Sequence, residues 1–116
     1  MAKYEEKLQG DFEEFLEVLN DGIMTGSATA HLEDSSDYVS GDVRCAVRVY
    51  ERYSMIGENR VSLNITLIGN KIDLFISAIT AGGSRAVLFK INTFGEKSFL
   101  KQVKELVEDY KNQSDS

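Results

Sequence analysis

From Ser27 to Ile91 apolar residues recur at every second position, and this alternation constrains the fold more than any other feature. A period of two is typical of β-strands, because successive side chains point to opposite faces of a sheet. Proline, which cannot donate to the hydrogen-bond ladder of a central strand, is absent from the chain. Short turns rich in Gly and Asn separate the strands, so we expect neighbouring strands to pair antiparallel.

The alternation predicts five strands in this block and assigns one face of each to the core. The expected inward residues are Ala28, Ala30 and Leu32; Val43, Cys45, Val47 and Val49; Val61, Leu63, Ile65 and Leu67; Ile72, Leu74, Ile76 and Ala78; and Val87, Phe89 and Ile91. We expect an acidic loop over residues 33–37 and a tight turn at residues 69–70. A weaker alternation over residues 3–9 indicates a further strand before this block.

Two amphipathic helices flank the strands. Asp11 with Glu14, and Thr93 with Glu96, have the spacing of capping boxes, and we expect Gly22 and Gly26 to end the first helix. The apolar faces are Phe12, Phe15, Leu16, Leu19 and Ile23 in the first helix, and Phe99, Val103, Leu106, Val107 and Tyr110 in the second.

Both helices need an apolar sheet face to cover theirs. We therefore predict an α+β fold with an antiparallel sheet of five or six strands and two helices packed on one face, in the order (β)-α-β5-α. This topology resembles the TBP-like and helix-grip folds, and a likeness of topology carries no function with it.

The 116 residues fit one domain, which we place at residues 1–112, with a flexible tail over residues 113–116. The first residues are charged and lack the apolar run of a signal peptide, so a cytoplasmic location is expected. No apolar stretch approaches the roughly 20 residues that a membrane-spanning helix needs.

Charge is unevenly divided along the chain. The formal net charge of −6 argues against a general binder of nucleic acid or anionic membranes. However, residues 1–40 hold 2 basic and 10 acidic side chains, whereas residues 41–92 hold 7 basic and 4 acidic ones. Within the basic block, Arg44, Arg48 and Arg52 alternate along one strand, and we expect them on the face that the helices leave open.

An open face that mixes Arg, Tyr and aliphatic groups is typical of an interface. The leading hypothesis is a non-enzymatic binding module, most simply a homodimer; the alternative is a solvated face with paired arginines. The expected contact residues are Arg44, Arg48, Tyr50, Arg52, Arg60, Asn64, Phe75 and Arg85.

Two other kinds of ligand suit the same face. Arginines bind carboxylates and phosphates in a bidentate way, so the second hypothesis is a binder of an anionic small molecule, or an enzyme that acts on one, on the Arg-rich face near the Gly82-Gly83-Ser84 turn. Single-stranded RNA lying across Arg48, Tyr50 and Arg52 is a third, which the net charge disfavours.

Residues for catalysis or metal binding are scarce. The single cysteine, Cys45, has inward parity and is expected to be buried and inert, while the single histidine, His31, is expected at the surface. Asp34, Asp37 and Asp42 lie close in sequence without the spacing of a calcium loop. We therefore expect no catalytic residue, metal site or cofactor.

The segments 41–53, 77–84 and 89–96, which read GDVRCAVRVYERY, SAITAGGS and FKINTFGE, resemble a family of small bacterial proteins of unknown function. The similarity runs nearly the whole chain. It implies one cytosolic domain, and the family offers no catalytic or binding residues to carry over.

Overall fold

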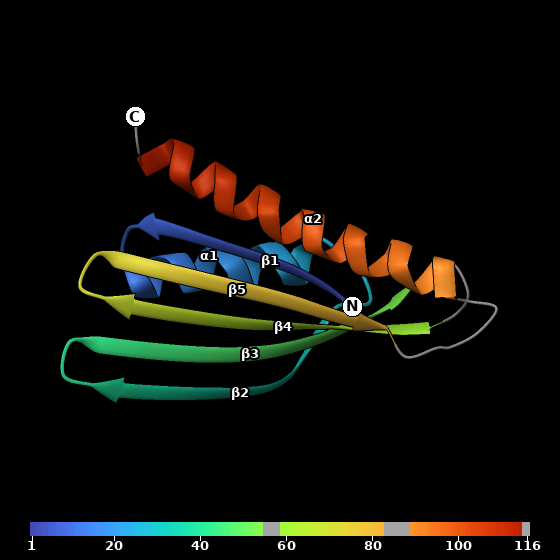
Figure 1. The fold of residues 1–116 in the computed structure, drawn as a ribbon, viewed down its shortest axis with the longest axis horizontal. Helices are drawn as coiled ribbons and strands as arrows, with labels where there is room; N and C mark the ends of the chain where they lie inside the picture. Colours follow the sequence, from blue (N-terminus) through green and yellow to red (C-terminus); the bar gives the residue numbers. More distant parts are fainter. Residues whose placement is uncertain (55–58, 83–88, 115–116) are drawn as a thin grey trace.

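Five antiparallel strands and two helices make up the computed structural model, which describes residues 1–54, 59–82 and 89–114 (Figure 1). The elements in chain order are β1 (Ala2–Gln9), α1 (Phe12–Thr25), β2 (His31–Ser40), β3 (Val43–Ser54), β4 (Asn59–Asn70), β5 (Asp73–Gly82) and α2 (Phe89–Ser114). The strand order in the sheet is β1-β5-β4-β3-β2, with every neighbouring pair antiparallel. The predicted α+β class is confirmed, as is the strand over residues 3–9.

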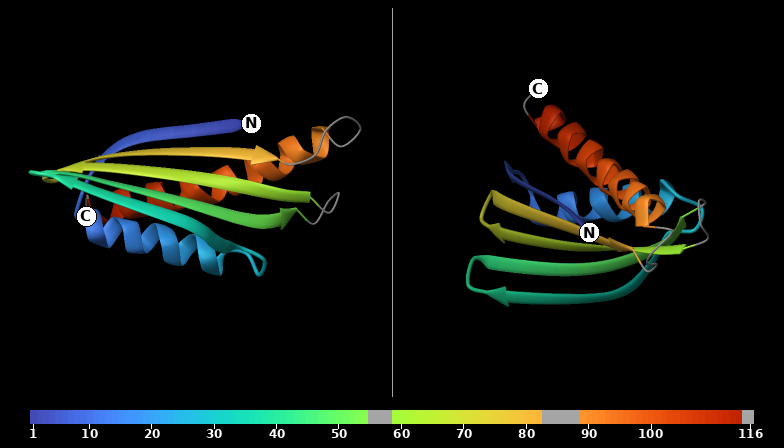
Figure 2. Two further views of the ribbon diagram at one scale, coloured as in Figure 1. Left: turned by 90° about the horizontal axis from the view of Figure 1, so that it is seen from below. Right: turned by 45° about the vertical axis from the view of Figure 1, so that its right-hand side comes forward.

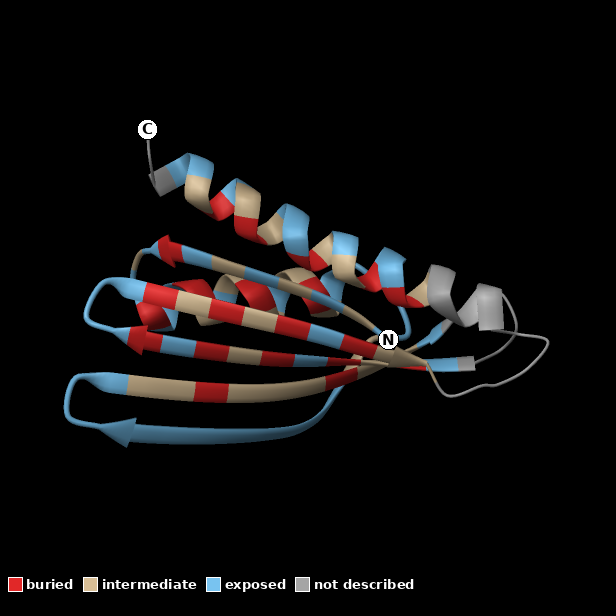
Figure 3. Ribbon diagram, in the orientation of Figure 1, coloured by how far each residue is buried: buried red, intermediate tan, exposed pale blue. Residues whose placement is uncertain are grey.

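Both helices pack on one face of the sheet, as predicted (Figure 2). Their apolar stripes meet the inward residues of the central strands in one continuous core. Its fully buried members include Phe15, Leu19 and Ile23 from α1, Phe99, Val103 and Val107 from α2, and Leu63, Ile65, Leu67 and Ile76 from the sheet. The strand β2 lies outside this cover and is exposed along almost its whole length (Figure 3).

The first helix begins at the predicted cap and ends at Gly26, the second of the two glycines expected to end it. Asp11 caps it, its Oδ2 accepting a hydrogen bond of 2.9 Å from the Glu14 amide. Gly22 does not end the helix, which continues to Thr25 with Gly26 as its C-cap. A Cβ at Gly22 would lie 2.3 Å from Leu106 Cδ2, so this glycine lets α2 approach α1 closely.

Two strand predictions were wrong in position. The acidic residues 33–37 lie within β2, whereas Ala28 and Ala30 precede it. An edge strand exposed on both faces needs no apolar alternation, because pairing with β3 through the backbone is enough to hold it. Near the other end, Phe89 and Ile91 lie in α2, while Val87 is outside the described residues.

The second helix therefore begins earlier than its expected cap. Thr93 lies inside α2, and Glu96 is buried two turns from the helix start. An alternation of only three apolar residues cannot distinguish a short strand from the first turn of a helix. The helix runs on to Ser114, two residues into the segment that we expected to be a flexible tail.

The inward face was predicted correctly for β4 and incorrectly for β3. Val61, Leu63, Ile65 and Leu67 are all buried against the helices. In β3, however, Ala46 and Tyr50 are the buried residues, at 0% and 1% exposure, while Val43 is 39% exposed. The two faces of β3 are therefore exchanged relative to the prediction: the residues expected to face the helices face away from them, and the residues expected to face away face the helices.

Strand pairing explains this inversion. Residues directly opposite in an antiparallel pair share a face, and Ala46 pairs with Leu67 while Tyr50 pairs with Leu63. The alternating arginines of β3 must then point to the helix side, where their long aliphatic stems cover the edge of the core. A smaller error concerns Ile72, which lies in the turn before β5 and is 61% exposed.

Candidate functional site

The sheet face turned away from the helices, hereafter the open face, carries a broad apolar surface. Its central residues are Val43, Cys45, Val47 and Val49 from β3, Asn64, Thr66 and Ile68 from β4, and Phe75, Ser77 and Ile79 from β5. Ile68 and Ile79 are each 39% exposed, and the rim residue Tyr38 of β2 is 68% exposed. A sheet face that mixes exposed aliphatic, aromatic and small polar side chains in this way is typical of an interaction site.

Two rows of side chains cross the open face from one edge to the other. The first row is Tyr38, Cys45, Ile68, Phe75 and Lys7. The second row is Asp34, Val49, Asn64, Ile79 and Lys3. Both rows have uncharged side chains in the middle and end in a lysine at the β1 edge. At the β2 edge the first row ends in a tyrosine and the second in a carboxylate.

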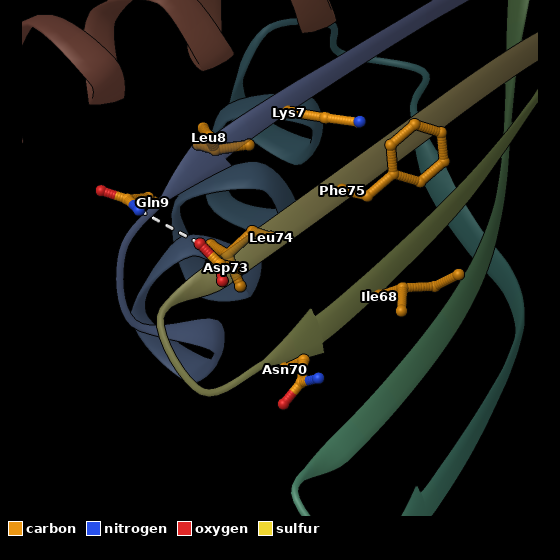
Figure 4. A pocket seen from close by; sticks show the side chains of 8 residues that line it. All are labelled: Lys7, Leu8, Gln9, Ile68, Asn70, Asp73, Leu74 and Phe75. Atoms are coloured by element: carbon orange, nitrogen blue, oxygen red, sulfur yellow. Dashed lines mark hydrogen bonds between the residues drawn. The ribbon is translucent and has the colours of Figure 1, made fainter.

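The first row borders a groove of about 570 Å³ near the turn between β4 and β5 (Figure 4). Ile68 and Phe75 supply apolar side chains, and Lys7 and Asn70 supply polar ones. Gln9 Nε2 donates a hydrogen bond of 3.1 Å to Asp73 Oδ1 at the groove's rim. The groove is therefore a local hollow in the apolar face, with hydrogen-bonding groups at its border.

The arginines of β3 do not lie on the open face, contrary to the prediction. Arg44 forms an ion pair with Glu13 of α1, and its guanidinium lies 4.4 Å from the centre of the Phe12 ring. Arg48 Nη2 lies 2.9 Å from Asp37 Oδ1 of the neighbouring strand.

Arg52 and Tyr50 are likewise turned toward the helices. The Arg52 guanidinium lies 4.1 Å from the centre of the Phe99 ring and donates to Gln102 Oε1 and Ser98 Oγ at 3.3 Å each. The Tyr50 hydroxyl donates to Asn20 Oδ1 at 2.8 Å, and burial raises its pKa to about 12. These side chains hold the helices to the sheet.

Three of the predicted contact residues do lie on the open face, and they are spread over it. Phe75 and Asn64 belong to the two rows, while Arg60 lies at the far end of β4. Arg60 Nη1 pairs with Glu51 Oε1 at 3.0 Å, and its guanidinium lies 5.5 Å from the centre of the Tyr53 ring. Arg85 and the residues Gly83 and Ser84 lie outside the described part of the chain.

Cys45 was expected in the core and instead lies on the open face. It sits between Tyr38 and Ile68 in the first row and is partly exposed. The inversion of β3 explains the error, because the same pairing that buries Ala46 turns Cys45 outward.

A cluster that the sequence did not reveal lies at the far end of the open face. His31, Glu33 and Glu51 each offer a ligand atom, and these atoms all lie within 4.8 Å of one another. A register shift between Leu32 and Asp34 marks a β-bulge at this point, which re-aims the neighbouring side chains. The only signal in the sequence was the His31-x-Glu33 spacing, because the inverted assignment of the faces of β3 placed Glu51 on the side of the sheet opposite His31.

The three aspartates weighed as a calcium site are not brought together. Asp34 pairs with Val49 and faces the open side, whereas Asp37 pairs with Ala46 and faces the helix side. Asp42 lies in the turn before β3. Opposite faces of one strand cannot supply ligands to a single ion.

No helix within residues 1–54, 59–82 and 89–114 combines the length and the apolar character needed to cross a membrane. Comparison with curated proteins gives no match, and comparison with solved structures gives none either. The model of one protein family, described as a family of unknown function (DUF6054), matches residues 1–111. Since the match spans nearly the whole chain, the protein belongs to this family of unknown function.

Proposed function

We propose that this protein is a self-associating module in which the open face of one copy packs against the open face of a second copy. The observation that carries the proposal is the uncovered apolar surface of β3, β4 and β5, with Ile68 and Ile79 left 39% exposed. Packing two sheets face to face, about 10 Å apart, is a common way to bury such surfaces.

The size of the face suits a stable dimer. Five strands spaced about 4.8 Å apart, each about ten residues long and rising about 3.3 Å per residue, give a face of roughly 800 Å². This is about the area that each partner buries in a standard protein interface. Polar residues at the border, such as Gln9 and Asp73, would form the hydrated rim of such an interface.

Charge favours a second copy as the occupant and also favours one orientation. A two-fold axis running parallel to the strands, along β4, places the β1 edge of one copy over the β2 edge of the other. Lys3 then meets Asp34 of the second copy, because both belong to the same row. An axis in the plane of the face and perpendicular to the strands would instead place β1 over β1, and Lys3 would face Lys3 if that axis passed through the second row.

The edge of β2 is another surface through which two copies could pair. As a terminal strand of the sheet, β2 is exposed along almost its whole length, but it carries Glu33, Asp34 and Asp37. Pairing two β2 strands antiparallel would bring these acidic side chains close together, and charged edge residues and bulges discourage that pairing. The open face is therefore the better surface.

The hypothesis of an anion bound by clustered arginines finds no support in the described residues. Arg44, Arg48 and Arg60 each pair with a carboxylate, and Arg52 is held by α2. They also lie on two different faces of the sheet, so they do not converge on one ligand.

Sedimentation velocity over a range of concentrations tests the proposal. We expect the wild-type protein to be dimeric and Phe75→Asp to be monomeric, because the variant buries a charge in the middle of the interface. Ile72→Asp is the control: it also replaces an apolar side chain by a carboxylate, but at an exposed position in the turn outside the open face.

A wild-type protein that stays monomeric at millimolar concentration would overturn the proposal. So would a dimer that Phe75→Asp leaves intact while circular dichroism reports an unchanged fold, because the interface would then lie elsewhere.

A further inference from the structure

We infer that His31, Glu33 and Glu51 form a binding site for a divalent transition-metal ion at the far end of the open face. The chain holds a single histidine, and the fold places it close to two carboxylates, one on the edge strand β2 and one on its neighbour β3. His31 pairs with Glu51 across β2 and β3, so their side chains share one face.

The hydrogen bonding of the imidazole ring supports a ligand role for His31. Its Nδ1 lies 3.1 Å from the carbonyl oxygen of Thr29, which can only accept, so Nδ1 carries a proton. Nε2 forms an ion pair with the Glu33 carboxylate, and a metal ion would bind there in place of the proton that lies between the two groups. Metal-binding histidines usually donate their other ring N–H to a carbonyl or carboxylate in this way.

Thr29, whose carbonyl oxygen accepts from His31 Nδ1, is itself held in place by hydrogen bonds of its side chain. The Thr29 hydroxyl oxygen accepts a hydrogen bond of 3.1 Å from the Tyr53 amide and lies 3.3 Å from Ser27 Oγ. The turn before β2 is thereby tied to β3, and the orientation of the His31 ring follows from that tie.

The geometry requires only small movements of exposed side chains. Donor atoms around a tetrahedral ion with bonds of about 2.0–2.1 Å lie roughly 3.3 Å apart, compared with the present spread of up to 4.8 Å. The side chains of His31 and Glu33 are 44% and 37% exposed, so rotation about their bonds is not restricted by core packing. Further coordination positions would be open to water.

The chemistry of the donors selects the class of ion. One imidazole and two carboxylates suit Zn²⁺ or Mn²⁺, whereas Ca²⁺ and Mg²⁺ prefer sites made of oxygen atoms alone. Arg60 pairs with Glu51 at 3.0 Å and competes with any cation for that carboxylate. Removal of the Arg60 charge should therefore strengthen metal binding.

Titration of the protein with Zn²⁺, followed by isothermal calorimetry and by competition with a chromophoric chelator, tests the site. We expect one ion per chain, with affinity at least tenfold higher than for Ca²⁺. His31→Ala and Glu51→Gln should each weaken Zn²⁺ binding at least tenfold, whereas Arg60→Gln should tighten it.

Asp34→Asn is the matched control, because it removes a neighbouring carboxylate of β2 that is not in the cluster. The inference is overturned if Zn²⁺ binds no more tightly than Ca²⁺, or if Asp34→Asn weakens binding as much as His31→Ala. Repeating the titration on Phe75→Asp keeps the result independent of self-association.

Discussion

Side chains on the two faces of the sheet differ in the contacts that they make. On the covered face, even the charged residues have specific partners, as Arg44 has in Glu13 and Arg52 in Gln102. On the open face, Ile68 and Ile79 pack against no helix and remain 39% exposed. Arginine is tolerated on the covered face because its stem is apolar and its charged end reaches polar groups of the helices. The aliphatic residues of the open face remain in contact with water, and a second surface packed on them would remove that contact.

The largest expected effect is a difference in stability between alanine variants of two isoleucines of β5 that point to opposite faces. Ile76→Ala removes a fully buried side chain and should lower the free energy of unfolding by about 2–5 kcal/mol. Ile79→Ala, on the open face, should lower it by only about 1 kcal/mol. Chemical denaturation at a concentration that keeps the protein monomeric measures both.

At concentrations where the proposed dimer would form, Ile79→Ala should also weaken self-association, and Ile76→Ala should not do so beyond its effect on folding. Equal losses of stability for the two monomeric variants would mean that the faces do not differ as described.

A smaller effect is expected from the polar anchor of the covered face. Tyr50→Phe removes the hydrogen bond to Asn20 and should cost about 1 kcal/mol of stability, measured at neutral pH. Because burial raises the pKa of Tyr50 from 10 in the unfolded chain to about 12, the folded state favours the protonated hydroxyl. This contribution is fully present below pH 10 and is lost as the pH rises through 12.

The alkaline loss of stability should therefore be shallower in Tyr50→Phe than in the wild type. Two other tyrosines remain in the variant and contribute to the residual slope: burial raises the pKa of Tyr4 to about 12 and also raises the pKa of Tyr110. Identical pH profiles for the two proteins would contradict the burial of the Tyr50 hydroxyl.

The smallest effect concerns the charged ends of the second row. Lys3→Asp and Asp34→Lys should each weaken the dimer severalfold, because each places like charges together twice in the symmetric interface. The double variant should recover most of the loss, and both effects should shrink at high salt. Sedimentation equilibrium measures the dissociation constants, and a double variant no tighter than either single one would exclude this orientation.

The sequence predicted the fold class because β4 is unambiguous. Its apolar residues Val61, Leu63, Ile65 and Leu67 alternate with Ser62, Asn64 and Thr66, so only one face can be buried. The capping box at Asp11 and the apolar stripes of the helices are equally clear, and they required the helices to share one face.

The face of β3 could not be predicted from its own residues. One side of the strand holds Val43 and Cys45 with further valines, and the other holds Ala46 and Tyr50 among arginines. Hydrophobicity favours the first side, but the pairing with β4 decides in favour of the second. When both faces of a strand are partly apolar, pairing with the neighbouring strand decides which face is buried. For β3 this pairing also decided which residues lie on the open face.

The cluster at His31 depended on two features that no sequence pattern carries. It requires the true face of Glu51, which follows from the same pairing, and the bulge in β2, which shifts the register after Leu32. The spacing of His31 and Glu33 was the only local indication.

Cross-linking across the proposed two-fold axis tests the central claim most directly. Cys45→Ser removes the native thiol, and Asn64→Cys or Ile68→Cys then places one thiol on β4, along the axis. Because residues on a two-fold axis face their own copies, we predict that a short bis-maleimide reagent links two chains efficiently in both variants. Ile72→Cys in the same background, with its thiol outside the open face, should remain unlinked. Failure of both β4 variants to cross-link, or linkage through Ile72→Cys alone, would contradict the account.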